Sequence, residues 1–209
     1  MAPIISTFAA GSANGFKSAV TGDPIVAPMT DWNHTNISTS SISGKVLTAT
    51  SSNASGDNAA YTTAIPNFNN TTGIYFDVTV TNGLESGGVG MIGISNYNET
   101  SSVTGFTASQ QTSWYYSGVI YGVGSGYSGS VPNLVSGTHR IALKSSSSGS
   151  FTPVMYMRCD TGSSLITFGP LDLPTNMSTY YIMATNQNSY PMINVTLGDN
   201  FYEGSGGLW

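Results

Sequence analysis

Short runs of alternating apolar and polar residues fill the chain from about residue 44 to residue 198. Each run is rich in β-branched and aromatic residues and is bounded by Gly, Asn, Ser or Pro, which is typical of strands joined by turns. No segment of ten or more residues places apolar side chains at helical three-four spacing. The pattern predicts strands at Gly44–Thr50, Ala59–Ile65, Gly73–Thr81, Val89–Ser95, Ser113–Val123, Thr138–Ser145, Thr152–Cys159, Ser164–Phe168, Thr179–Thr185 and Met192–Gly198.

The same alternation predicts which face of each strand is buried. In Gly73–Thr81 the expected core side is Ile74, Phe76, Val78 and Val80, and the expected wet side is Tyr75, Asp77, Thr79 and Thr81. In Thr138–Ser145, His139 falls on the apolar side and Arg140 on the other. The glycines of Val89–Ser95 indicate a strand that is buried on both faces or pressed by a neighbouring backbone. Many short strands at regular spacing predict an all-β protein, a sandwich or barrel.

The two ends of the chain lack this pattern. Residues 1–30 hold three prolines and three glycines and predict an extended N-terminal arm, with at most a short strand at Ile4–Phe8. The β-sandwich is expected over residues 31–202, and residues 203–209 are expected to form a C-terminal tail. The apolar arm residues expected to dock onto a partner are Ile4, Ile5, Phe8 and Phe16.

Charged residues make up only 7% of the chain, against about 25% in an average soluble protein. A surface of hydroxyls and amides suits packing against copies of the same chain or contact with sugars, because few ions must lose their water. The net charge of -5 and the scattered basic residues argue against nucleic-acid binding. The sequence also has no run of about 18 apolar residues, so no membrane span is expected.

Catalytic and metal-binding patterns are sparse. His34 and His139 lie far apart, no Gly-x-Ser-x-Gly motif joins a strand to a helix, and Cys159 is the single cysteine. Zinc-ligand spacing is missing, and Asp57 and Asp199 are single acids where calcium loops cluster several. We therefore expect no enzyme activity, cofactor or metal. Sugar cleavage by paired carboxylates stays open as an alternative, although solvated side chains are favoured for the acids concerned, which are Asp77, Glu85, Asp160, Asp172 and Asp199.

An aromatic band, "WYYSGVIYG", favours a sugar-binding interpretation, because Trp and Tyr faces pack on the C–H faces of sugars. Read as one strand, it puts Trp114, Tyr116, Gly118 and Ile120 on one face. Packing in the core is the alternative for Trp114 and Tyr116. Candidate ligand contacts are Trp114, Tyr116, Tyr121, Tyr127, Asn186 and Asn188, the last two from a loop of the kind that carries recognition in a sandwich.

Several strands carry motifs that resemble the SPRY family, a concanavalin A-like β-sandwich of two antiparallel sheets. "DWN" at Asp31–Asn33, "GIYFDVTVT" with Asp77 where the family has Glu, "GMIGIS", "WYYSG" and "HRIALK" are similar to successive family strands. "DTGSSLITF", Asp160–Phe168, and "YPMINVTLGDNF", Tyr190–Phe201, are similar to its later segments. The resemblance covers about residues 31–202. It implies that Ile166 and Phe168 point inward and that "GPLDLP" is the turn after them.

The opening "ISTFAAGSANGF" is similar to N-termini of bacteriophage tail and virion proteins. Together with the composition, it favours a non-enzymatic virion protein that is assembled in the host cytoplasm and functions outside the cell. We expect it to dock to other virion proteins through the arm, to form a homo-oligomer, and to attach to glycans of the host surface. A capsid decoration or head-fibre subunit is the alternative, and a glycan-active hydrolase is an alternative of another class.

Overall fold

The computed structural model of the chain describes residues 23–32, 40–49, 58–68, 73–81, 90–96, 111–115, 117–145, 153–174, 179–186 and 193–204. Within these ranges the backbone forms strands and connecting turns, with a single short 3-10 helix, η2, at Val123–Gly126. None of the described residues belongs to a helix with the length and apolar character needed to cross a membrane.

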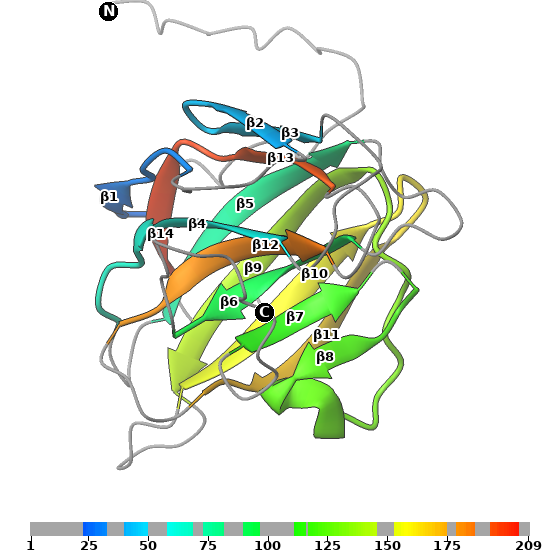
Figure 1. The fold of residues 1–209 in the computed structure, drawn as a ribbon. Helices are drawn as coiled ribbons and strands as arrows, with labels where there is room; N and C mark the ends of the chain where they lie inside the picture. Colours follow the sequence, from blue (N-terminus) through cyan, green and yellow to red (C-terminus); the bar gives the residue numbers. More distant parts are fainter. Residues whose placement is uncertain are drawn as a thin grey trace, which may run out of the picture.

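The described strands form two antiparallel sheets that face each other, with η2 at one end (Figure 1). The large sheet has the order β11 (Leu165–Asp172), β10 (Pro153–Asp160), β9 (Gly137–Ser145), β5 (Gly73–Thr81), β13 (Asn194–Leu197), β3 (Val46–Ala49) and β2 (Ser40–Ser43). It also contains β14 (Asn200–Gly204), which pairs with β5, and β1 (Ile25–Pro28), which pairs with β14. The small sheet has the order β4 (Asn58–Ala64), β12 (Tyr181–Asn186), β6 (Gly90–Ser95), β7 (Gln111–Tyr115) and β8 (Ile120–Gly122). The predicted antiparallel β-sandwich is confirmed.

One hydrophobic core fills the space between the sheets. Phe76 and Ile141 reach it from the large sheet, and Ile92, Trp114 and Ile182 reach it from the small sheet, all at 0% exposure. The alternation predicted for β5 and β9 accounts for the large-sheet half of this core, because every second side chain of a strand points to the same face. The other face of the large sheet points away from this core, and we call it the outer face.

On the outer face of β5, one side chain is more buried than the alternation predicts. Tyr75 was expected to be wet, but its exposure is 0%. The guanidinium carbon of Arg140 lies 4.1 Å from the Tyr75 ring centroid, and the Tyr202 ring stacks on Tyr75 at 5.2 Å between centroids. A single strand's period could not reveal this cover, because Arg140 and Tyr202 come from β9 and β14.

The glycine-punctuated strand β6 is buried along its whole length, as predicted. A Cβ added at Gly93 would lie 2.2 Å from the carbonyl oxygen of Thr112 and 2.5 Å from the Cα of Ser113. The backbone of β7 is thus the close neighbour that the sequence indicated.

The predicted continuous strand Ser113–Val123 is wrong, because this segment is a hairpin of β7 and β8. Gly118 has a φ of 75°, its N–H donates to the carbonyl of Tyr115, and Trp114 lies opposite Ile120. Glycine adopts this backbone region at low cost, which allows the reversal. The single strand is therefore wrong, but Trp114 and Ile120 still share one face as predicted, because they lie opposite each other and are both buried in the core.

The predicted strand Ser164–Phe168 and the turn after it also need correction. Strand β11 continues through Gly169 and Pro170 to Asp172, with a register shift opposite β10 and a cis bond between Gly169 and Pro170. Phe168 is buried, and Ile166 lies opposite the core residue Cys159 of β10, so both side chains are on the inward face as implied, although Ile166 is still 36% exposed. The reason is that β11 lies at the edge of the large sheet.

Both predicted boundaries of the sandwich shift outward. Residues 25–28 of the predicted arm form β1, and Met29 is buried in the core, so the sandwich includes residues 23–30. Residues 203 and 204 of the predicted tail belong to β14. The proposed arm residues Ile4, Ile5, Phe8 and Phe16 lie outside the described residues, as does the predicted strand Ile4–Phe8.

Candidate functional site

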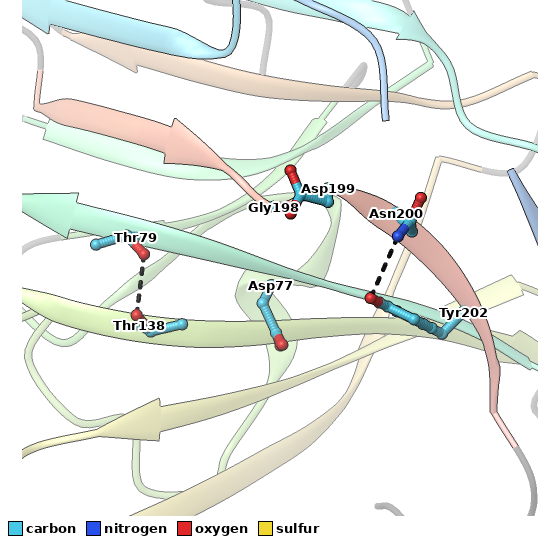
Figure 2. A pocket seen from close by; sticks show the side chains of 7 residues that line it. All are labelled: Asp77, Thr79, Thr138, Gly198, Asp199, Asn200 and Tyr202. Atoms are coloured by element: carbon cyan, nitrogen blue, oxygen red, sulfur yellow. Dashed lines mark hydrogen bonds between the residues drawn. The ribbon is translucent and has the colours of Figure 1, made fainter. Parts of the chain in front are cut away.

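A cavity of about 190 Å³ opens on the outer face of the large sheet, where β5 and β9 approach the junction between β13 and β14. Figure 2 shows two threonine side chains on one side of Asp77 and those of Asn200 and Tyr202 on the other. The cavity is smaller than the roughly 300–1,000 Å³ of drug-sized sites. We call it the outer-face cavity, and its lining is Asp77, Thr79, Thr138, Gly198, Asp199, Asn200 and Tyr202.

Two adjacent strands supply one side of the outer-face cavity. Thr79 on β5 lies directly opposite Thr138 on β9, and their hydroxyl oxygens are 2.9 Å apart. Both belong to the side of the strands that points away from the core, as the alternation of β5 predicts. These hydroxyls are hydrogen-bonded to each other and can still donate or accept one further bond each to a ligand.

Asp77 is fixed by a bidentate ion pair. The Nε and Nη2 atoms of Arg140 donate to its two carboxylate oxygens at 2.8 and 3.0 Å. The Arg140 side chain is only 6% exposed and that of Asp77 20%. Burial acts to lower the pKa of Arg140, but the hydrogen bonds and charge of Asp77 outweigh it and raise that pKa. The sequence interpretation of Asp77 as a solvated acid is therefore wrong.

The opposite wall forms where the β13–β14 segment leaves its regular pairing with β5. The Gly198 N–H donates to the carbonyl of Asp77 at 2.9 Å, and a Cβ at Gly198 would lie equally close to that oxygen. Glycine is required at such a close approach of two backbones. The next residue, Asp199, has a carboxylate that is 90% exposed and lies 3.3 Å from the Nζ of Lys45.

Tyr202 and Asn200 complete this wall on β14. One face of the Tyr202 ring is stacked on Tyr75, and the Asn200 amide donates to the Tyr202 hydroxyl at 3.4 Å. The cavity thus combines an aromatic ring with carboxylate, amide and hydroxyl groups. Such groups can hydrogen-bond several hydroxyls of one small ligand.

The residues predicted from sequence to bind a ligand do not meet at this cavity. Trp114 is fully buried in the core, so the packing alternative holds for it in this structure. Tyr121 is half-buried on β8, and Tyr127 packs against the core after η2. Asn186 ends β12, and its side chain is outside the described set, as are Tyr116 and Asn188.

Two of the five carboxylates considered for sugar cleavage do lie at the cavity. Asp77 and Asp199 both line the outer-face cavity, whereas Asp160 and Asp172 do not, and Glu85 lies outside the described residues. No sequence motif marks Thr79, Thr138, Asn200 or Tyr202 as site residues. Alternation could have marked the threonines as outward-facing, but it could not show which strands lie side by side.

Across the described ranges, no group of three His, Cys, Asp or Glu side chains could hold a metal ion.

His139 has a structural position on the opposite, inward side of β9. Its ring packs edge-on against Trp114 at 5.0 Å between centroids. Its Nε2 lies 2.7 Å from the carbonyl of Val135, and its Nδ1 accepts the backbone N–H of Asp160 at 3.4 Å. A neutral ring that donates from Nε2 satisfies both contacts, and burial lowers the pKa of His139.

We expect this histidine to destabilise the fold in mild acid. The unfolded chain binds a proton near pH 6.5, while the folded ring resists it until lower pH, so the free energy of unfolding falls as pH drops below about 6.5. Above pH 7 the histidine no longer destabilises the fold, because it is neutral in both the folded and the unfolded chain. In urea unfolding at pH 7.5, 6 and 5, the free energy of unfolding should fall more steeply with decreasing pH in the native chain than in His139→Gln. Parallel slopes would contradict this assignment.

No protein-family model matches the chain, and no curated protein matches it. Among solved structures, it is similar to the SPRY domain of human HERC1, with 14% identity over 74% of this chain and 88% of that chain and a TM-score of 0.49. It is similar to the winged bean acidic lectin complexed with methyl-α-D-galactose, with 12% identity, coverage of 84% and 92%, and a TM-score of 0.48. The exoplasmic/lumenal domain of VIP36, in a form bound to Ca²⁺ and Man3GlcNAc, gives 9% identity, coverage of 87% and 86%, and a TM-score of 0.49.

These likenesses are low in identity and partial in overlap, so they say nothing of a ligand for this chain. The class of protein is defined by its own strands: it is an antiparallel β-sandwich with a small polar cavity on the outer face of one sheet.

Proposed function

We propose that the protein is a non-catalytic carbohydrate-binding β-sandwich, which takes a single sugar ring in the outer-face cavity. The observation that carries this proposal is the lining itself, which brings Asp77, Asp199, Asn200 and Tyr202 around a small volume. A sugar ring offers many hydroxyls and needs several oriented polar partners in one place. The size of the cavity, about 190 Å³, favours one ring or a chain terminus over an extended oligosaccharide.

The charge distribution favours an uncharged sugar. Carboxylates line the cavity, while Arg140 and Lys45 contact these carboxylates without being part of the lining. The negative ends of both ion pairs therefore face the ligand. Sugar hydroxyls can donate to the lone pairs that the carboxylates keep. A uronic acid or a sulfated sugar would meet like charge at close range, which costs free energy.

The same contacts favour binding over sugar cleavage. Ionised carboxylates are acceptors only, and a hydrolase also needs a carboxyl group that can give up a proton. Asp77 and Asp199 each form an ion pair, with Arg140 and Lys45 respectively. We therefore propose that these two acids hold sugar hydroxyls and do not act on the glycosidic bond.

For the biological setting we propose attachment of a bacteriophage particle to glycans of the host surface. This part of the proposal is supported by the low content of charged residues and by the N-terminal likeness described above. Homo-oligomerisation and docking through residues 1–22 belong to the same hypothesis. A decoration or head-fibre role is the second candidate, and it requires incorporation into particles without any glycan binding.

A matched pair of asparagine variants tests the proposal. After a glycan-array screen has identified a neutral ligand, Asn200→Ala is expected to weaken its affinity roughly three- to tenfold, because one hydrogen bond to the ligand is lost. Asn133→Ala, at an exposed position outside the cavity lining, should bind like the native chain. Calorimetric titration measures both. The proposal fails if no neutral glycan binds, or if the two variants behave alike.

A further inference from the structure

Strand β1 supports one wall of the outer-face cavity through its backbone. It pairs with β14, placing Pro28 opposite Asn200. The N–H of Met29 donates to the carbonyl of Asp199 at 2.8 Å, and the N–H of Glu203 donates to the carbonyl of Pro24 at 2.9 Å. These contacts bracket the whole β14 wall, so the positions of Asp199, Asn200 and Tyr202 depend on β1 being in place.

A second connection runs from the residues before β1 to the other wall through side chains. The Tyr75 hydroxyl donates to the carboxylate of Asp23 at 2.8 Å. The Tyr75 ring lies under the guanidinium of Arg140, and Arg140 holds both carboxylate oxygens of Asp77. Four side chains thus connect residue 23 to the cavity wall.

Burial makes this series of contacts stiff. Tyr75 and Arg140 are 0% and 5% exposed, so neither side chain can move aside without breaking packing or a charged hydrogen bond. Burial first, and the hydrogen bond to Asp23 second, raise the pKa of the Tyr75 hydroxyl and keep it a neutral donor. Loss of Asp23 would remove this hydrogen bond from a side chain that is packed beneath Arg140.

We propose that the segment from Asp23 to Met29 is a positioning element of the outer-face cavity, with Asp23 as a positioning residue that acts on Asp77 through Tyr75 and Arg140. Attachment of this segment and ligand binding are then coupled, and the coupling is reciprocal. Any partner that binds or displaces the chain before residue 23 then changes the affinity of the cavity for its ligand. The positional part rests on the contacts alone, whereas the part about affinity rests on the proposed function.

The positional part is tested without a ligand. The Nε–H of Arg140, buried and bonded to Asp77, is expected to give a slowly exchanging signal in proton–nitrogen NMR spectra of the full chain. Asp23→Ala and Tyr75→Phe should each speed its exchange about tenfold or more, whereas Asp23→Asn, which keeps an acceptor oxygen, should stay near the native rate. Asp172→Ala is the matched control, because its exposed carboxylate lies outside the cavity lining. An unchanged rate in both Asp23→Ala and Tyr75→Phe overturns the inference.

The affinity part uses the neutral glycan found by the array. We expect Asp23→Ala to weaken binding about three- to tenfold at a temperature where it is fully folded, and glycan binding to slow amide exchange at Met29 in the native chain. A glycan that binds all variants equally overturns the coupling but leaves the proposed function intact. If no glycan binds, the proposed function fails, and the Arg140 exchange rates still decide the positional part.

Discussion

Replacing Asp77 by Ala is expected to lower the free energy of unfolding by up to about 3–5 kcal/mol, which is the cost of removing one partner from a fully buried ion pair. Arg140 would keep its charge in a place where its side chain is 6% exposed, and no carboxylate would remain at 2.8 Å. The guanidinium is packed over the Tyr75 ring, so a rotamer change cannot easily move it into solvent. Urea unfolding at pH 7.5 measures the loss.

Two comparisons separate burial from charge in this result. Asp199→Ala removes the other carboxylate of the cavity, but its side chain is 90% exposed, and surface pairs of this kind contribute about 0–1 kcal/mol. The double variant Asp77→Leu with Arg140→Met removes both charges and should recover much of the stability lost in Asp77→Ala. A loss below 1 kcal/mol in Asp77→Ala would mean that Arg140 is solvated, and would contradict the geometry on which the cavity wall depends.

The sequence was informative wherever one strand sufficed to define an environment. The alternation in β5 gave its core side, and the glycines of β6 indicated the close backbone that Gly93 meets. The strands β1, β2 and β14 were missed because they are four or five residues long and lie in Pro-, Ser- or Gly-rich segments. Their strand character comes from pairing with distant segments, which has no local period.

The candidate site was less predictable for the same reason. Thr79 and Thr138 are 59 residues apart in sequence, and Asp77 and Asp199 are farther apart still, so only the sheet order brings them to one cavity. The aromatic band was predicted to bind sugar because Trp and Tyr are common in sugar sites and easily recognised in a sequence. Their spacing did not reveal the turn at Gly118 that separates β7 from β8. Outward-facing polar residues on a strand carry no mark that distinguishes a site from an ordinary wet face.

Replacing Trp114 by Ala is the second large effect, because the ring is fully buried between the two sheets. It packs edge-on against Phe168 at 5.2 Å between centroids, and its Nε1–H donates to the carbonyl of Pro132 at 2.8 Å. Truncation of a buried Trp costs about 3–5 kcal/mol, since a large cavity forms and the part-buried Pro132 carbonyl loses its donor.

Thermal and urea unfolding measure this loss, and Tyr121→Ala, at a half-buried position of β8, should cost clearly less. Binding distinguishes the core role from the ligand role that the sequence left open. Trp114→Phe refills most of the volume, so we expect it to fold and to bind the same neutral glycan with native affinity, because Trp114 is not part of the cavity lining. Native stability combined with lost binding in Trp114→Ala would instead place the ring at a ligand surface, and the glycan site would then have to be sought along β7.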